Sequence, residues 1–369
     1  MLEALFQFLA GFVIIGTFLP FVKCDYWMIR GWDFPRIQLF CVGLFAGLGL
    51  LVTRLDDPND FTDSILLVAL LVTLFTLFTW IFRYTPFHRK EVLDGKGNVT
   101  ISFLVSNVLM SNRKSAGLVS HIRDKKPDMF ICLETDQWWI DQIAVTKDEY
   151  PHGVEIPQED TYGMIVRSRI PFEDLHVEYF IRDNIPSVHA DFKLEDGSVV
   201  HLHAVHPKPP FPDENTDTTS TDRDAELLLV GKRVEKQGGP TIVLGDLNDV
   251  AWSLTTKLFQ KTSGLLDPRV GRGLFNTFHA GHWFLRWPLD HIFISDHFRV
   301  RSLERLASIG SDHFPIFAEF SYEPSGANEQ EAPEKSEGDD EEADEKIASA
   351  KNKNQSRAES LDILADSSI

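Results

Sequence analysis

Two runs of 19 residues without a charged side chain, residues 4–22 and 64–82, are the feature that most constrains this chain. About 20 apolar residues in a helix are needed to cross the hydrocarbon core of a bilayer. A shorter apolar run with several glycines lies between them, at residues 37–53. A buried core helix is the alternative for a single run, but three runs this close together favour a membrane anchor over residues 1–82, with two or three transmembrane helices. No basic segment precedes the first run, which disfavours a cleaved secretory signal.

Basic residues beside the runs predict an orientation. With three spans, three basic residues fall in the first loop and three follow the last span, against one in the second loop. The positive-inside rule then places the first loop and the large C-terminal region on the cytoplasmic side. With two spans this orientation can reverse. We therefore expect an integral protein of the inner or plasma membrane with a cytoplasmic C-terminal region. The basic residues are Lys23, Arg30 and Arg36 in the first loop, Arg54 in the second, and Arg83, Arg89 and Lys90 after the third run.

A change of pattern after the anchor predicts a folded domain. Residues 83–98 contain Pro86, Gly95 and Gly97 and are typical of a linker. From residue 99 to 322, short β-rich runs alternate with helical patterns, and this mixture favours an α/β sandwich. The expected strands are 99–105, 129–134, 162–168, 187–194, 199–205, 241–245, 290–295 and 313–320, and the expected helices are 115–126, 222–237 and 251–261.

The last part of the chain, residues 323–369, has the composition of an acidic disordered tail. Residues 326–369 contain 5 Lys and Arg against 13 Asp and Glu, within a net charge of -19 for the whole chain. Such acidity disfavours sequence-blind binding of nucleic acid through charge alone. It does not exclude a nuclease whose metal ions supply positive charge locally.

Polar side chains follow or open most of the expected strands. Since strand ends meet at one edge of such folds, we expect these side chains to gather around a ligand. No glycine-rich phosphate loop, cysteine-rich zinc spacing or serine-hydrolase elbow competes with them. The set consists of Asn107, Glu134, His206, Asp246, Asn248, Asp290, Asp312 and His313.

The order and spacing of these motifs resemble the endonuclease/exonuclease/phosphatase superfamily, which includes deoxyribonuclease I, abasic-site endonucleases, inositol polyphosphate phosphatases and bacterial sphingomyelinases. The motifs are SN at 106–107, CLE at 132–134, HP at 206–207, GDLND at 245–249, LDHIF at 289–293 and GSDHFPI at 310–316. The resemblance covers residues 97–322 and implies a four-layered α/β sandwich. It also implies a metal-dependent phosphoester hydrolase, here a membrane-anchored member of bacterial type.

The resemblance implies a metal site for Mg²⁺ or Mn²⁺. Glu134 is similar to the principal metal ligand of the family, and hard divalent ions do prefer carboxylate oxygens. Asn107 would assist in the shell of the metal and the phosphate. Asp312 would bind a metal ion or serve the leaving group.

The remaining residues resemble the groups that act on phosphorus. Asp246 is similar to the residue that orients or deprotonates the attacking water, and Asn248 to the residue that points its amide at the phosphoryl oxygen. Asp290 is expected to pair with His313 and to hold its imidazole for transition-state stabilisation. His206 would donate to a nonbridging oxygen. Asp249, by contrast, is expected to be the N-cap of the helix that follows.

The substrate stays open. A nuclease, a phospholipid or sphingolipid phosphodiesterase and a phosphomonoesterase all fit, with nucleic acid or lipid as the partner, and the membrane anchor favours lipid. Abasic-site members carry a carboxylate two residues after the asparagine, whereas Asn107 is followed by Val108 and Leu109, which disfavours that activity. An inactive membrane scaffold is a further alternative, disfavoured by the complete motif set. Trp283 and Trp287 are compatible with base stacking or a membrane rim, although half-buried loop aromatics are more usual.

Overall fold

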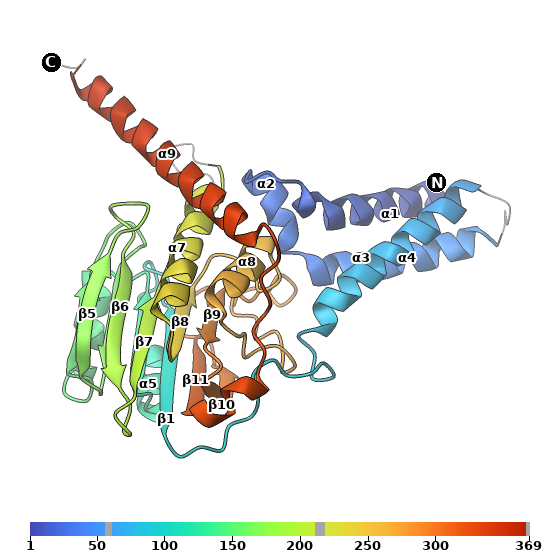
Figure 1. Ribbon diagram of the computed structural model, residues 1–369. Helices are drawn as coiled ribbons and strands as arrows, with labels where there is room; N and C mark the ends of the chain where they lie inside the picture. Colours follow the sequence, from blue (N-terminus) through green and yellow to red (C-terminus); the bar gives the residue numbers. More distant parts are fainter. Residues whose placement is uncertain (56–60, 211–217, 367–369) are drawn as a thin grey trace. The chain divides into compact units, whose positions relative to one another are not determined.

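The computed structural model describes residues 1–55, 61–210 and 218–366, and it divides into two compact units. One unit is formed by Met1–Arg89 with the short segments Phe211–Ser220 and Gly271–Gly273. The other is formed by Lys90–Pro210, Thr221–Val270 and Leu274–Ile369. Figure 1 traces the elements of both.

The first unit is built from three apolar helices, α1 (Leu2–Phe18), α3 (Arg36–Thr53) and α4 (Phe61–Phe82), which pack against one another (Figure 1). All three are long and apolar enough to cross a membrane. The shorter third run therefore has the length and composition of a span as well. Small residues bring the helices close together, and large apolar side chains such as Phe45, Leu71 and Phe75 face outward. An outward apolar surface of this kind suits a lipid environment.

Short elements connect α1 to α3 in this unit. They are the 3-10 helix Leu19–Phe21, α2 (Trp27–Arg30) and the 3-10 helix Gly31–Asp33. Arg36 and Asp33 form a buried ion pair at 2.8 Å, and the Arg36 guanidinium lies over the Trp80 ring. A charge this close to the apolar helices is thus paired rather than isolated.

The first sheet of the second unit has six strands in the order β10-β11-β1-β2-β4-β3. Their bounds are β1 Thr100–Asn107, β2 Met129–Leu133, β3 His152–Ile156, β4 Met164–Ser168, β10 Phe298–Arg305 and β11 Ile316–Tyr322. β1 and β2 run parallel, and the other pairs are antiparallel. Helices α5 (Ala116–Lys125) and α6 (Gln137–Ile143) pack on its outer face.

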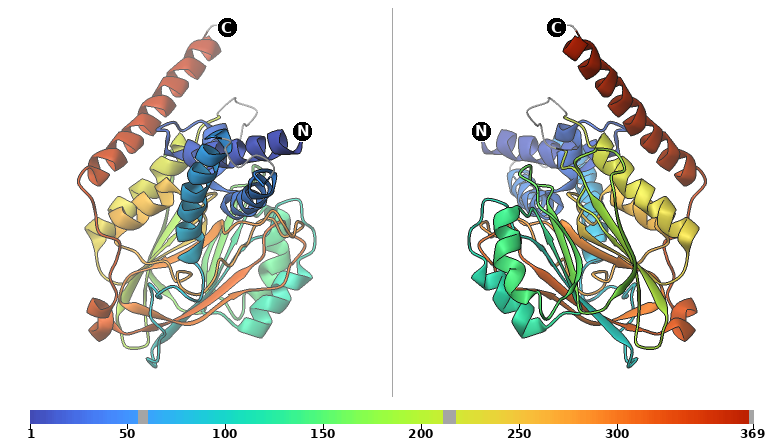
Figure 2. Two further views of the ribbon diagram at one scale, coloured as in Figure 1. Left: turned by 90° about the vertical axis from the view of Figure 1, so that its right-hand side faces the viewer. Right: turned by 90° about the vertical axis from the view of Figure 1, so that its left-hand side faces the viewer.

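The second sheet has five strands in the order β5-β6-β7-β8-β9. They are β5 Phe172–Glu178, β6 Ser187–Lys193, β7 Val199–Ala204, β8 Thr241–Asp246 and β9 Asp290–Ile294. Helices α7 (Thr221–Gln237) and α8 (Leu254–Ser263) cover part of its outer face. The inner faces of both sheets enclose one apolar core and helices lie on both outer faces, so the predicted four-layered α/β sandwich is confirmed (Figure 2).

The segment before β1 contributes to this unit. Val92 is fully buried in the apolar core, and Leu93 and Gly95 exchange backbone hydrogen bonds with Val300 of β10. Residues 90–98, expected as part of a linker, therefore extend the edge of the first sheet.

The C-terminal segment differs from the expected disordered tail. Residues Asp339–Asp366 form a long helix, α9, whose first half packs on α7 and α8 (Figure 1). Ala343, Ile347 and Ala350 are spaced by four and three residues, and this spacing aligns them on one helix face. Within this acidic segment, the three residues form a short apolar stripe that packs against α7 and α8. The 3-10 helix Pro324–Glu329 precedes it.

Candidate active site

The ends of strands from both sheets meet at one edge of the sandwich, and the predicted residues gather there. Asn107 is the last residue of β1, and Glu134 directly follows β2. Asp246 ends β8 opposite Asp290, which opens β9, and the two are cross-strand partners. The sequence prediction that these side chains converge therefore agrees with their positions.

One amide group joins the two sheets at the centre of this site. Asn107 Nδ2 donates to Glu134 Oε1 at 2.8 Å and to Asp246 Oδ2 at 3.0 Å. Asn107 Oδ1 in turn accepts from the backbone N–H of Leu109. Asn107 is completely buried, and so its amide fixes the separation of the two carboxylates.

His313 lies between two aspartates on the other side of the site. Its Nδ1 is 2.7 Å from Asp290 Oδ2, and its Nε2 is 3.5 Å from Asp246 Oδ2. The expected pairing of Asp290 with His313 is present. One carboxylate faces each ring nitrogen, and the two together restrain the imidazole ring.

Backbone strain is concentrated at the same edge. Glu134 and Asn248 have φ angles of 60° and 50°, in the left-handed region that non-glycine residues seldom occupy. Gly245 has φ 143°, and a Cβ atom there would lie 1.9 Å from the backbone oxygen of Val205. Strained residues of this kind persist where the surrounding structure fixes them, and they cluster at functional sites. The glycine of GDLND is required by the close approach of its own backbone to Val205.

Asn248 is held by three hydrogen bonds. Its backbone N–H donates to Asp246 Oδ1 at 2.9 Å, and its side-chain Nδ2 donates to the Pro207 oxygen at 3.0 Å. Its backbone oxygen accepts from Arg223 Nη1 at 2.9 Å. One amide hydrogen of Asn248 is thus used within the protein, and the second hydrogen of the same group is the one left for a ligand.

His206 and Asp312 lie beside these groups. His206 is buried, and its Nδ1 has no hydrogen-bond partner among the described residues. Tyr162 lies next to it, with ring centroids 5.7 Å apart. Asp312 is partly exposed, and its backbone oxygen accepts from the Ala280 N–H. An orphaned buried ring nitrogen is a feature that a bound ligand can satisfy.

Burial shifts the pKa values of the charged groups. It raises the pKa of Glu134 to about 7, and the Asp246 carboxylate adds to this rise against the hydrogen bond from Asn107. Burial likewise raises the pKa of Asp246, which the neighbouring His313 opposes. Burial alone would lower the pKa of His313, but Asp290 and Asp246 outweigh it and raise the pKa to about 10. His313 is therefore an imidazolium at neutral pH, while burial lowers the pKa of His206 and keeps that ring neutral.

Two groups of residues at this edge have donor atoms suited to a cation. Ligand atoms of Asp246, Asp290 and His313 lie within 4.8 Å of one another. A protonated His313 has no lone pair to offer, however, so this trio is better described as an ion-pair network. The predicted ligand Glu134 is a half-buried carboxylate close to Asp246 and Asp312, and this excess of negative charge fits a hard divalent cation.

Three supporting residues escaped the sequence analysis. Arg223 holds the Asn248 carbonyl, Thr277 Oγ1 accepts from the backbone N–H of Asp290, and Ser311 Oγ donates to the Asn107 carbonyl. The Ser311 hydroxyl also accepts from the backbone N–H of His313. Ser311 lies inside the quoted GSDHFPI motif, but nothing local marks Arg223 or Thr277.

Asp249 lies below the site and differs from its expected role. The N-cap of α8 is Ser253, whose hydroxyl accepts from the Thr256 N–H. Asp249 accepts from the Ser253 hydroxyl and forms a 3.4 Å ion pair with Arg223. The carboxylate therefore supports the cap rather than forming it.

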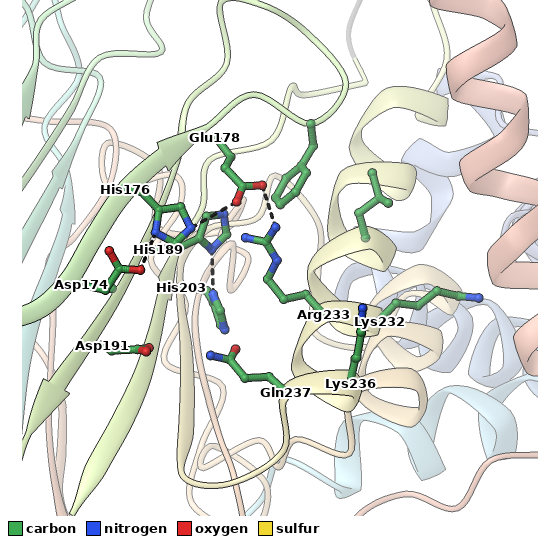
Figure 3. A pocket seen from close by; sticks show the side chains of 13 residues that line it. Asp174, His176, Glu178, His189, Asp191, His203, Lys232, Arg233, Lys236 and Gln237 are labelled. Carbon is green, nitrogen blue, oxygen red and sulfur yellow. Dashed lines mark hydrogen bonds and ion pairs between the residues drawn. The ribbon is translucent and has the colours of Figure 1, made fainter.

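His201 and His203 lie away from the site, on the outer face of the second sheet, as their alternation with apolar residues indicates. His203 is in register with His189 of β6 and His189 with His176 of β5, so that three imidazoles form a row across neighbouring strands. The row lies in a cavity of about 560 Å³ between β5 and α7 (Figure 3). His189 and His203 are bonded to each other, Nδ1 to Nδ1, at 2.7 Å.

A two-sheet sandwich with acids, an amide and histidines at one edge is suited to hydrolysis of a phosphoester. The chain belongs to the Endonuclease/Exonuclease/phosphatase family, which it matches over residues 104–313. The family resemblance predicted from the motifs is thus confirmed. No curated protein matches this sequence.

Solved structures with a similar fold include TDP2 of D. rerio in complex with a single-strand DNA product. Its sequence is 16% identical, the TM-score is 0.49, and the match covers 60% of this chain and 99% of that chain. The catalytic domain of human Nocturnin with a bound sulfate anion has 18% identity, a TM-score of 0.49 and coverage of 60% and 94%. Beta toxin 275-280 of Staphylococcus aureus has 18% identity, a TM-score of 0.44 and coverage of 59% and 99%. These similarities concern the fold alone.

Proposed function

We propose that this protein is a membrane-anchored phosphodiesterase, dependent on Mg²⁺ or Mn²⁺, that hydrolyses its substrate by a single in-line attack of water on phosphorus. The observation that carries this proposal is the environment of Asp246. It lies between the Asn107 amide and the His313 imidazolium, with Asn248 bonded to its second oxygen. A carboxylate held in this way is suited to orienting a water and accepting its proton.

The other residues stabilise charge on the phosphoryl group and hold it in position. His313, held by Asp290, donates from Nε2 to the phosphoryl oxygen that gains charge in the transition state. Asn248 supplies its remaining amide hydrogen to the same group, and the neutral His206 ring donates to a nonbridging oxygen. None of the predicted site residues forms a nucleophile and base pair, which favours direct attack by water over a covalent intermediate.

The divalent ion is assigned to Glu134 with Asn107 and Asp312. When bound, such an ion neutralises charge on the substrate phosphate. Asn107 donates to Glu134 and Asp246 through its nitrogen, and its oxygen accepts from the Leu109 N–H, so it would assist the ion by fixing the position of the Glu134 carboxylate. Asp312 is partly exposed and would either bind the ion or serve the leaving group.

The direct test is a hydrolysis panel with the full chain in detergent. Plasmid DNA, RNA, sphingomyelin and inositol phosphates are each incubated with Mg²⁺, with Mn²⁺ and with a chelator. We expect metal-dependent hydrolysis of at least one substrate, with inversion at a chiral phosphorothioate. No hydrolysis of any member contradicts the enzyme assignment, and retention of configuration or a trapped phosphoenzyme contradicts the in-line mechanism.

The first candidate substrate is a nucleic acid, and the second is a lipid phosphodiester. The lipid is favoured by an exposed apolar segment in a loop whose base contacts the site. Trp283, Phe284 and Leu285 are 84%, 49% and 43% exposed at the tip of the loop before β9. The base of that loop contacts the site, because Phe278 pairs with His313 and packs against its ring. Exposed aromatic side chains are characteristic of the membrane interface, and α1, α3 and α4 supply a membrane attachment for the same chain.

Substituting Trp283 separates the two candidates. Trp283→Ala is expected to lower hydrolysis of a phospholipid or sphingomyelin in vesicles about tenfold, because fully burying a large apolar side chain contributes about 1.5–3 kcal/mol and an interfacial ring is buried in part. Hydrolysis of a small soluble phosphodiester is expected to stay unchanged. Tyr179→Ala, at another exposed aromatic residue, is the matched control. An equal fall on both substrates would show that Trp283 supports the site rather than lipid binding.

We further propose that the hydrolase domain is cytoplasmic. The support is the basic first loop and the basic stretch after α4, together with a third helix of sufficient length. A cytoplasm-active reporter fused to the C-terminus is expected to be active, and an export-dependent reporter inactive. The reverse pattern overturns this orientation.

A further inference from the structure

The imidazole row on the outer face of the second sheet belongs to a cluster of metal-ligating side chains outside the candidate active site. His176 of β5, His189 of β6 and His203 of β7 lie directly opposite one another on neighbouring strands. The row lines the cavity of about 560 Å³, and Asp174 and Glu178 flank His176 on the same face of β5 (Figure 3). Imidazole nitrogens and carboxylate oxygens are the ligands that proteins offer to zinc and related ions.

His189 is buried and has one ring nitrogen without a partner. Only 2% of the residue is exposed, and its Nε2 has no hydrogen-bond partner among the described residues. Its Nδ1 lies 2.7 Å from Nδ1 of His203, which is equally buried and whose Nε2 also has no partner in the described chain. Burial lowers the pKa of His189 to about 2, so the ring is neutral at neutral pH. When His189 donates its Nδ1 proton to His203, its Nε2 carries a lone pair that an ion can use.

His176 has a partner at each ring nitrogen. Its Nδ1 lies 3.1 Å from Asp174 Oδ2, and its Nε2 lies 3.1 Å from Glu178 Oε1. An Asp174 carboxylate that accepts the Nδ1 proton matches the carboxylate that commonly stands behind a histidine ligand of a metal ion. The Nδ1 atoms of His176 and His189 therefore both face an acceptor, which leaves Nε2 of each ring as the ligand atom.

The Glu178 carboxylate is held beside these nitrogens. Arg233 Nη2 bonds its Oε2 at 2.7 Å, while its Oε1 faces His176. An unprotonated Nε2 and a carboxylate oxygen are both acceptors, so a proton or a metal ion must join them. Ligands about 2.0–2.1 Å from a tetrahedral zinc ion lie about 3.3 Å from one another, and the separation of 3.1 Å suits a shared ion.

We propose that His176, Glu178 and His189 bind a divalent transition-metal ion that prefers imidazole, such as Zn²⁺, with Asp174 and His203 as positioning residues for the two rings. The His176 and His189 ring centroids are 5.6 Å apart. The His176 side chain is 45% exposed on an edge strand, and turning it toward His189 brings the three ligand atoms together. The bound ion ties β5 to β6. This inference does not rest on the proposed function, because zinc binding is measured without substrate.

Zinc titration of the full chain in detergent tests the site, with Mg²⁺ in excess to fill sites that prefer hard ions. At least one Zn²⁺ per chain is expected to bind and to raise the thermal midpoint, since a ligand of the folded state stabilises it. His189→Phe and His176→Ala are each expected to weaken this binding at least about tenfold, because each removes a ligand. His176→Ala changes a partly exposed side chain, so it decides the test if His189→Phe does not fold.

His201→Phe is the matched control, at an imidazole on the same face of β7 but opposite Asp191 rather than in the row. It is expected to keep wild-type zinc affinity. A wild-type chain that binds no zinc, or wild-type affinity in a folded His176→Ala variant, overturns the proposal. An equal loss in His201→Phe overturns it as well, because the row is then not the site.

The positioning role of His203 has its own test. His203→Phe removes the acceptor for the His189 Nδ1 proton and is expected to weaken zinc binding about tenfold to a hundredfold, as loss of such a partner usually does. His203→Gln is expected to recover most of the affinity, because its side-chain oxygen again accepts this proton. Unchanged affinity in His203→Phe, or no recovery in His203→Gln, overturns the positioning role.

Discussion

Asp246→Asn is expected to lower the turnover number by about a hundredfold to a thousandfold with little change in the thermal midpoint. Removing one preorganised group from a hydrolytic site costs about 2.7–4 kcal/mol of transition-state stabilisation. Stability changes little because burial disfavours the charged form of Asp246 and raises its pKa, so the amide removes this cost together with the attraction to His313. The asparagine still accepts a hydrogen bond from Asn107 but takes no proton from water. Steady-state kinetics and calorimetry on the full chain measure both quantities.

His313→Ala is expected to cause a comparable loss, because it removes the imidazolium between Asp246 and Asp290. Asp174→Asn makes the same acid-to-amide change as Asp246→Asn at an exposed position on β5 and serves as its control. Near-normal turnover in both Asp246→Asn and His313→Ala would remove these residues from the site. A large fall in the Asp174→Asn control would show that net charge, rather than the site, determines the rate.

Glu134→Gln is expected to weaken Mg²⁺ and Mn²⁺ binding about a hundredfold and to lower turnover at a fixed metal concentration by a similar factor. Glutamine keeps the shape of the side chain and the acceptor for Asn107, but it loses the charge that a hard divalent cation requires. A hundredfold change corresponds to about 2.7 kcal/mol, within the several kcal/mol that metal ions contribute to such reactions. Isothermal calorimetry measures the affinity.

The matched control for this change is Glu173→Gln, at a half-exposed glutamate on β5. It is expected to leave metal affinity unchanged. Equal metal affinity in wild type and Glu134→Gln would remove Glu134 from the metal site. The assignment would then pass to Asp246 and Asp290, the acidic members of the other cation-suited group.

The strands that sequence patterns failed to predict have one physical property in common. β3, β5 and β10 all lie at the edges of their sheets, whereas the predicted strands include every interior one. Interior strands are buried on both faces and read as apolar runs, as in residues 241–245. Edge strands such as FRVRSLER at β10 carry charges that discourage pairing with another chain, and these charges mask the strand pattern.

Some residues of the site could likewise be predicted from the sequence, and others could not. The residues proposed to contact the substrate lie in short motifs at strand ends, and the position of these motifs at strand ends predicted that the side chains gather. Arg223 was not predicted because it stands among charged residues in TDRDAE, a pattern typical of a solvated helix face. Arg223 of α7 contacts the GDLND turn, and Lys346 of α9 contacts the neighbouring Asp224. Contacts that depend on three separate elements leave no local signal.

The pairing of β1 with β11 determines when this protein can finish folding during synthesis. The two strands are partners in the first sheet although they lie more than 200 residues apart, from Thr100↔Ser321 to Val105↔Ile316. The three apolar helices leave the ribosome first, while β1 waits with an unpaired edge until residue 322 has been made. Long-range pairings of this kind form slowly and leave apolar surface open to aggregation. A ribosome that stalls before residue 316 therefore leaves the three apolar helices attached to an incomplete sheet whose apolar surface is open to aggregation.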